Sequence, residues 1–259
     1  MEESLNLNSP AHPKLTNRSD FWWLLPLLML LGFIVAGGYL TWAALVGENF
    51  AWGPYVSPVY ASPYVPSWWT LSPALLLLWI PAGFRLTCYY GRKAYYRAAF
   101  ANPGACAVEQ PHRKNYKGET RLPFILNNLH RYFLYLALAL LALHWYEWVA
   151  ALFYQDSIYV GLGTIIVLLD TIALTFYVGG CHSLRHIIGG KKRSFVGCCG
   201  CAKKNTCSKA GYGMWKKVSA LNIFHGTWFW VSLFSILLAD LYIRLLAMGI
   251  LSSDPHIIF

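Results

Sequence analysis

Five long apolar segments, separated by polar stretches, dominate the chain. Because a helix needs about 20 apolar residues to cross the hydrocarbon core of a bilayer, each segment is long enough to span it. We therefore predict an all-α fold: a single membrane bundle of five transmembrane helices over residues 21–259, after a polar tail at residues 1–20. The predicted spans cover about residues 21–46, 71–90, 124–153, 160–181 and 223–250.

The basic residues give the bundle an orientation. Lys and Arg gather in loops 91–123 and 182–222, whereas residues 47–70 and 155–159 contain neither. The positive-inside rule then places the N-terminus and both basic loops in the cytoplasm, and the C-terminus outside. Topology therefore accounts for the net charge of +10, and we expect no nucleic-acid partner. Only 12% of the residues are charged, about half the share in soluble domains.

Side chains that commonly bind metals gather at the predicted cytoplasmic ends of the spans. Ionisable groups near a membrane core are costly and usually functional, so this gathering suggests a cofactor site, a quinone site or a docking surface. The seven cysteines are odd in number and lie mostly on the reducing side, which favours thiols or metal ligands over disulfides. The gathered residues are Cys88, Cys106, His112, His130, Cys181, His182, His186 and His225.

His182 and His186 are four residues apart. If the fourth span stays helical as far as Gly189, both imidazoles project from one helix face, which suits two ligands of one metal. With Cys181 adjacent and Cys88 at the matching end of the second span, two cysteines and two histidines form the ligand set of a Rieske-type [2Fe–2S] centre. The alternative is that both histidines are interfacial residues that bind anionic lipid or a partner.

His130 and His144 both lie on the third predicted span. They are fourteen residues apart, so they share a face but stand about 21 Å apart along the axis. A haem b between His130 and either His186 or His225 remains open. No second ligand is evident for His144, which we expect to be a hydrogen-bonded residue of the bundle.

Two aspartates lie inside predicted spans. Asp240 and Arg244 have the i,i+4 spacing of an ion pair near the outer surface. Asp170 has no partner nearby in the sequence, which makes it a candidate for a proton path.

A further cysteine cluster, "GCCGCAKKNTC", runs from Cys198 to Cys207. It lacks a second C-x-x-C pair and a following histidine at zinc-finger spacing. We interpret it as a solvated loop rather than a zinc knuckle.

Four stretches, "FRLTCYYGRKAYYRAAF", "ACAVEQPHRKNYKGETRLPFILNNLHRYFLYLAL", "CHSLRH" and "LNIFHGTWFWVSLFSILLADLYIRLLAMG", resemble one family over about residues 84–249. It is the membrane-anchor subunit of succinate dehydrogenase/fumarate reductase complexes, in the single-chain, five-span form of actinobacteria. The resemblance implies a bacterial plasma-membrane protein that passes electrons from a docked iron–sulfur subunit to menaquinone or ubiquinone. A flavoprotein subunit with FAD would oxidise succinate, which this chain would not do alone. A higher oligomer, such as a trimer of complexes, is a further expectation.

The resemblance also implies a Rieske-type cluster inside the anchor. Its candidate ligands are Cys88, Cys106, Cys181, His130, His182, His186 and His225, and the choice among them stays open. A quinone headgroup needs hydrogen-bond donors and a flat apolar slot. The suitable residues are Tyr89, Tyr90, Arg92, His225 and Trp228.

Two alternatives remain. The chain could be a haem b anchor of the same complex, or a transporter or lipid enzyme with an interfacial metal. Against the last, the sequence shows no inverted repeat and no matched pair of Gly/Pro-broken spans.

Overall fold

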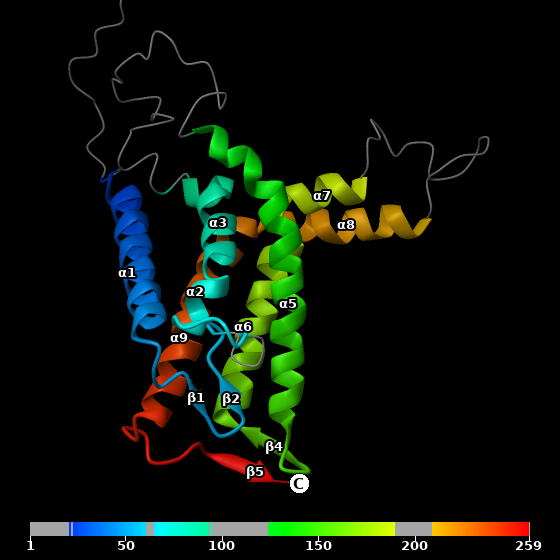
Figure 1. Ribbon diagram of the computed structural model, residues 1–259. Helices are drawn as coiled ribbons and strands as arrows, with labels where there is room; N and C mark the ends of the chain where they lie inside the picture. Colours follow the sequence, from blue (N-terminus) through cyan, green and yellow to red (C-terminus); the bar gives the residue numbers. More distant parts are fainter. Residues whose placement is uncertain are drawn as a thin grey trace, which may run out of the picture.

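Four long apolar helices are the main elements of the part of the chain that the structure describes. The computed structural model describes residues 21, 23–60, 65–92, 94, 124–189 and 209–258. Within these residues, four helices are long and apolar enough to cross a membrane. Figure 1 shows them running along one common direction, with α6 packed against both α5 and α9. They are α1 (Leu24–Val46), α5 (His130–Leu152), α6 (Leu162–Gly179) and α9 (His225–Ala247).

The second apolar segment forms two short helices in series rather than one long helix. Helix α2 covers Pro73–Leu77 and α3 covers Trp79–Thr87, with Leu78 between them. Pro81 explains the break, because a proline ring clashes with the carbonyl group four residues earlier, here that of Leu77. In Figure 1 the two helices follow one another along the direction of the long helices.

The fourth predicted span does not continue to Gly189. Helix α6 ends at Gly179, and a separate helix, α7 (His182–Gly189), begins after Cys181. Gly180 permits the tight turn, since a Cβ there would lie 2.9 Å from the Phe176 carbonyl oxygen. Helix α7 packs against α8 (Lys209–Ile223), and both run across the end of the bundle. The predicted loop 182–222 therefore contains two helices, and the condition of a fourth helix that continues to Gly189 is not met.

Short strands, which an all-α prediction omits, close the opposite end of the bundle. Strands β1 (Ala51–Trp52) and β2 (Tyr55–Val56) form an antiparallel hairpin. Strands β3 (Phe153–Tyr154), β4 (Ser157–Gly161) and β5 (His256–Ile258) form a second antiparallel sheet in that order. The C-terminal strand thus pairs with the segment that leads into α6. The third predicted span also begins differently, with a 3₁₀ helix η2 (Phe124–Leu129) before α5.

A buried carboxylate fastens these strands to the helices. Asp254 is 1% exposed. Its Oδ1 accepts hydrogen bonds from the Tyr242 hydroxyl at 2.5 Å and the Gly163 amide at 3.0 Å, and its Oδ2 accepts one from the Tyr55 hydroxyl at 2.7 Å. Burial raises the pKa of Tyr55, so its hydroxyl remains a donor. One side chain therefore joins β2, α6, α9 and the C-terminal segment.

Candidate functional site

Two contacts between a cysteine and a histidine lie inside the bundle, at the end where α7 and α8 cross it. The Cys88 Sγ lies 3.8 Å from the His225 Nε2, and the Cys181 Sγ lies 3.3 Å from the His130 Nε2. Cys88, Cys181 and His225 are 2%, 0% and 3% exposed. The structure therefore brings together two cysteines and two of the histidines that the sequence identified as candidate ligands.

Each of these four residues stands at a helix boundary. Cys88 follows α3 in an extended conformation, and Cys181 occupies the turn between α6 and α7. His130 and His225 are the first residues of α5 and α9. Because all four boundaries lie at one end of the bundle, side chains that are far apart in the sequence converge there.

Neighbouring side chains fix the two imidazole rings. Phe84 stacks on His130 with ring centroids 4.7 Å apart and planes inclined by 6°. Tyr177 stacks on His225 at 5.0 Å and 12°. The Thr87 hydroxyl lies 3.0 Å from the His130 Nδ1, which directs Nε2 toward the sulfur of Cys181. Such a second contact is what usually orients a metal-binding histidine.

Two polar groups at this site lack a partner within the described residues. The His225 Nδ1 and the Tyr177 hydroxyl are buried, and neither forms a hydrogen bond of normal geometry there. The Tyr177 hydroxyl faces Cys88. Buried polar groups without partners are rare and costly, so the site has unused capacity to bind a polar or metallic group. The described residues contain no group of three or more ligand-type side chains around a single point. The donors instead form two pairs.

Arg85 is a residue of this region to which the sequence analysis assigned no role. It lies in α3, is 7% exposed, and donates hydrogen bonds to the Phe229 carbonyl at 2.8 Å and the Ser232 hydroxyl at 2.9 Å. Its guanidinium carbon lies 4.7 Å from the ring centroid of Tyr177. The available signal was a cation inside an apolar segment, which usually marks function. Arg85 places positive charge beside the cysteines.

The remaining predicted metal ligands lie elsewhere. His182 and His186 are exposed on α7, with ring centroids 5.4 Å apart. Partial burial is the main cause of the lowered pKa of His182, and the nearby His186 and Arg185 lower it further. Both rings are exposed on α7, whereas Cys181, the residue before His182, is buried. Cys106 and the cluster from Cys198 to Cys207 lie outside the described residues.

The predicted quinone-binding residues surround the His225 side of the site. The Tyr90 ring lies 5.5 Å from the His225 ring, and Tyr89, which is 57% exposed, lies 5.4 Å from Tyr90. Arg92 belongs to the short helical stretch that follows Cys88. Trp228 lies three residues beyond His225 on α9. These side chains share one end of the bundle.

The two intramembrane aspartates have different surroundings. Asp240 and Arg244 form the expected pair, with 2.7 Å between Oδ2 and Nε, and both are buried. Asp170 is also buried, and its Oδ1 accepts a hydrogen bond from the Ser235 hydroxyl at 2.5 Å. Its assignment to a proton path stays a prediction.

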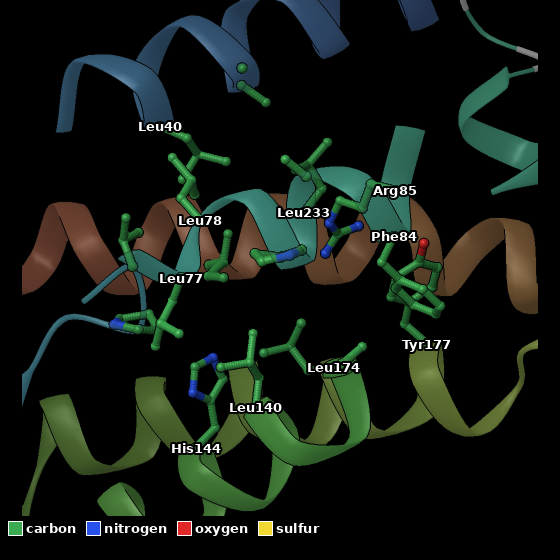
Figure 2. A pocket seen from close by; sticks show the side chains of 18 of the residues that line it. Leu40, Leu77, Leu78, Phe84, Arg85, Leu140, His144, Leu174, Tyr177 and Leu233 are labelled. Carbon is green, nitrogen blue, oxygen red and sulfur yellow. The ribbon is translucent and has the colours of Figure 1, made fainter. Parts of the chain in front are cut away.

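A partly open cavity of about 390 Å³ extends from this site toward the opposite end of the bundle, with the exposed side chains of Ile34 and Leu86 in its lining. We call it the inner cavity. Figure 2 shows Arg85 and His144 directed into it from α3 and α5, among leucine side chains. Phe84 and Tyr177, which stack on the two imidazoles, also line it. Its volume lies within the usual range of small-molecule sites, about 300–1,000 Å³.

Comparison with known proteins places the chain in a family. Comparison with curated protein sequences gives no match. A solved structure, the Mycobacterium smegmatis Sdh1 complex in the apo form, contains a chain that is 34% identical, with a TM-score of 0.81. The alignment covers 96% of this chain and 97% of that chain. The family described as actinobacterial succinate dehydrogenase subunit SdhC matches residues 24–249. The protein therefore belongs to the actinobacterial SdhC family and is a membrane subunit of a succinate dehydrogenase complex.

Proposed function

We propose that this chain anchors succinate dehydrogenase in the bacterial plasma membrane and reduces a quinone there with electrons from a Rieske-type [2Fe–2S] centre. The convergence of Cys88, Cys181, His130 and His225 carries the proposal. In this arrangement the N-terminus and the end with α7 and α8 face the cytoplasm, where the flavoprotein and iron–sulfur subunits would dock.

The residues at the site fit such a cluster. Two cysteines and two histidines are its ligand set, and here they form two pairs in which Cys88, Cys181 and His225 are buried and His130 is half-buried. One nitrogen of His225 is unsatisfied. When bound, the cluster exchanges single electrons, at a potential raised by its histidine ligands. The sequence left three cysteines and four histidines open for these positions. Their mutual contacts, together with the burial of Cys88, Cys181 and His225, favour Cys88, Cys181, His130 and His225 among them.

The surrounding side chains have specific tasks in this proposal. Thr87 holds the His130 ring through Nδ1, so that Nε2 is free to bind metal. Phe84 and Tyr177 cover the two imidazole rings and exclude water. Arg85 and the Tyr177 hydroxyl stabilise negative charge at the sulfur atoms, because hydrogen bonds and cations near cluster sulfurs favour the reduced state.

Helices α2 and α3 together would form the fifth span. The fifteen residues of Pro73–Thr87 extend for about 22 Å at helical rise, and flanking residues lengthen the segment. Figure 1 shows the pair lying along the direction of the long helices. Five spans would put the two chain ends on opposite sides of the membrane.

The test is spectroscopy and quinone kinetics on the purified complex. We expect the reduced complex to give an EPR signal with the low average g value of a [2Fe–2S] centre with histidine ligands. Across preparations, the rate at which succinate reduces a menaquinone analogue should rise with the intensity of this EPR signal. A positive pyridine haemochrome assay without that signal would instead establish the haem b alternative.

Gly91 offers a local test of how the chain positions Cys88. A Cβ at Gly91 would lie 2.2 Å from the Arg85 carbonyl oxygen, so Gly91→Ala must displace the backbone around Cys88. We expect a destabilisation of about 1–3 kcal/mol and a lower cluster content, measured by thermal unfolding and EPR spin quantitation. Gly213→Ala in α8 is the control, since nothing lies within 4 Å of a Cβ there. Equal stability and equal cluster content in the two variants would contradict the view that Gly91 positions Cys88.

A further inference from the structure

Two neighbouring cavities in the bundle share a wall. The inner cavity has a neighbour of about 200 Å³, which we call the outer cavity. His144, Glu147 and Pro58 line both cavities. The carboxylate and the imidazole are the two groups of this shared wall that can exchange protons. They therefore stand where a proton could pass from one cavity to the other.

The outer cavity lies at the end of the bundle that is predicted to face outside. The hairpin residue Tyr55 and the residues Tyr146 and Ala151 near the end of α5 line it, together with Thr171 of α6. Glu147 is five residues from the last residue of α5, or about 7.5 Å along the helix axis. Protons from the outer aqueous phase therefore need to travel only a short distance to reach it.

The inner cavity leads from the same pair toward the proposed cluster. It is lined mostly by apolar side chains, with Arg85 and Tyr177 at the end next to Cys88. Among the described residues, no carboxylate lies within ion-pair distance of Arg85, although the buried Asp170 lies close enough to interact with its charge. An apolar cavity with a cation at one end suits a quinone, which becomes anionic when it accepts electrons.

The geometry of the pair suits proton transfer. The His144 Nδ1 lies 3.6 Å from the Glu147 Oε2, and each side chain is 16% exposed. A small movement would close this gap to a hydrogen bond. A glutamate inside a membrane span is costly, and such residues usually mark ion or proton pathways. If the pair only stabilised the bundle, it would not need to face two cavities.

We propose that Glu147 and His144 form a proton relay that carries protons from the outer side of the membrane to the quinone. Glu147 gives its proton to the Nδ1 of His144, and the Nε2–H of His144 gives a proton into the inner cavity, where a reduced quinone oxygen accepts it. Each quinone takes up two electrons, which come from succinate, and two protons by this route. The two protons lost by succinate are released on the opposite side. The relay rests on the proposed quinone reduction, and it makes that reaction move charge across the membrane.

The experiment uses the whole complex in vesicles with a pH dye trapped inside. External succinate reaches only complexes with the succinate site outward, so the outer end of this chain faces the lumen. With a menaquinone analogue present, we expect the lumen to become alkaline as quinone is reduced. In Glu147→Gln, quinone reduction and alkalinisation should both fall by at least about tenfold, within the range for loss of a proton donor. The EPR signal reduced by succinate should remain.

Glu48→Gln is the matched control, because Glu48 is an exposed glutamate just after α1 that lines neither cavity. It should behave as the unaltered complex does. The relay is overturned if quinone is reduced without alkalinisation of the lumen, if Glu147→Gln matches Glu48→Gln, or if only Asp170→Asn blocks proton uptake. The first and second results leave quinone reduction intact, whereas a complex that reduces no quinone removes the proposed function as well.

Discussion

Cys88→Ser is expected to remove the [2Fe–2S] signal from the complex and to lower succinate-dependent quinone reduction by at least about tenfold. Loss of a residue that only hydrogen-bonds to a metal ligand already lowers metal affinity or activity by about 10–100-fold. The Cys88 sulfur is buried, lies 3.8 Å from the His225 Nε2, and has no solvent access through which a water could replace it. Serine oxygen is a poor substitute for a thiolate at iron. EPR spin quantitation and quinone kinetics on the same preparation provide the measurement.

The decisive control is His186→Ala. The sequence treats His186 as an equal candidate, but the structure places it exposed on α7. We therefore expect His186→Ala to keep both the signal and the activity. The oxidation of succinate by a soluble dye, which does not need the anchor's quinone site, should persist in both variants and show that the partner subunits remain bound. A signal that survives Cys88→Ser but disappears in His186→Ala would reverse the ligand assignment.

Asp240→Asn should cause the largest loss of stability among single substitutions away from the cluster. Asp240 is 0% exposed, and its Oδ2 accepts hydrogen bonds from the Arg244 Nε and the Tyr39 hydroxyl, each at 2.7 Å. The Ser57 hydroxyl donates to its Oδ1. The substitution leaves the buried Arg244 cation without its counter-charge, which costs about 3–5 kcal/mol. The melting temperature of the purified complex should fall by roughly 10 °C.

Asp156→Asn provides the matched control, because it makes the same chemical change at an exposed aspartate on the same end of the bundle. Its melting temperature should stay that of the unaltered complex. Adding Arg244→Met to Asp240→Asn should recover part of the loss, since removing both charges of a buried pair is cheaper than removing one. If Asp240→Asn has the same melting temperature as Asp156→Asn, the ion pair of Asp240 and Arg244 contributes little to the stability of the fold.

Several features of the fold follow from local sequence. The apolar segments predict four long helices to within a few residues, because a span must satisfy all of its backbone hydrogen bonds within one helix. The spacing of Asp240 and Arg244 predicts their pairing, since residues four apart share a helix face. The break at Leu78 could also have been anticipated, as Pro81 stands four residues after Leu77.

Other features could not be predicted. The i,i+4 spacing of His182 and His186 is locally the strongest metal signal in the chain, yet both side chains are exposed on α7, whereas Cys88 and Cys181 are buried. The contact between His144 and Glu147, by contrast, could have been predicted, because residues three apart on a helix share a face. Searching for ligands between helix ends alone overlooks such a local neighbour.

The sequence by itself determined that this is a helical membrane protein and which cysteines and histidines are candidate ligands. The orientation of its basic loops stays a prediction. These properties depend on hydrophobicity, charge and spacing along a single helix. Only the tertiary structure decided that Cys88 meets His225, that Cys181 meets His130, and that two cavities share the His144 and Glu147 wall. Those contacts join residues from different helices, and their distances depend on where each helix ends and how it packs, which no periodicity in the chain encodes.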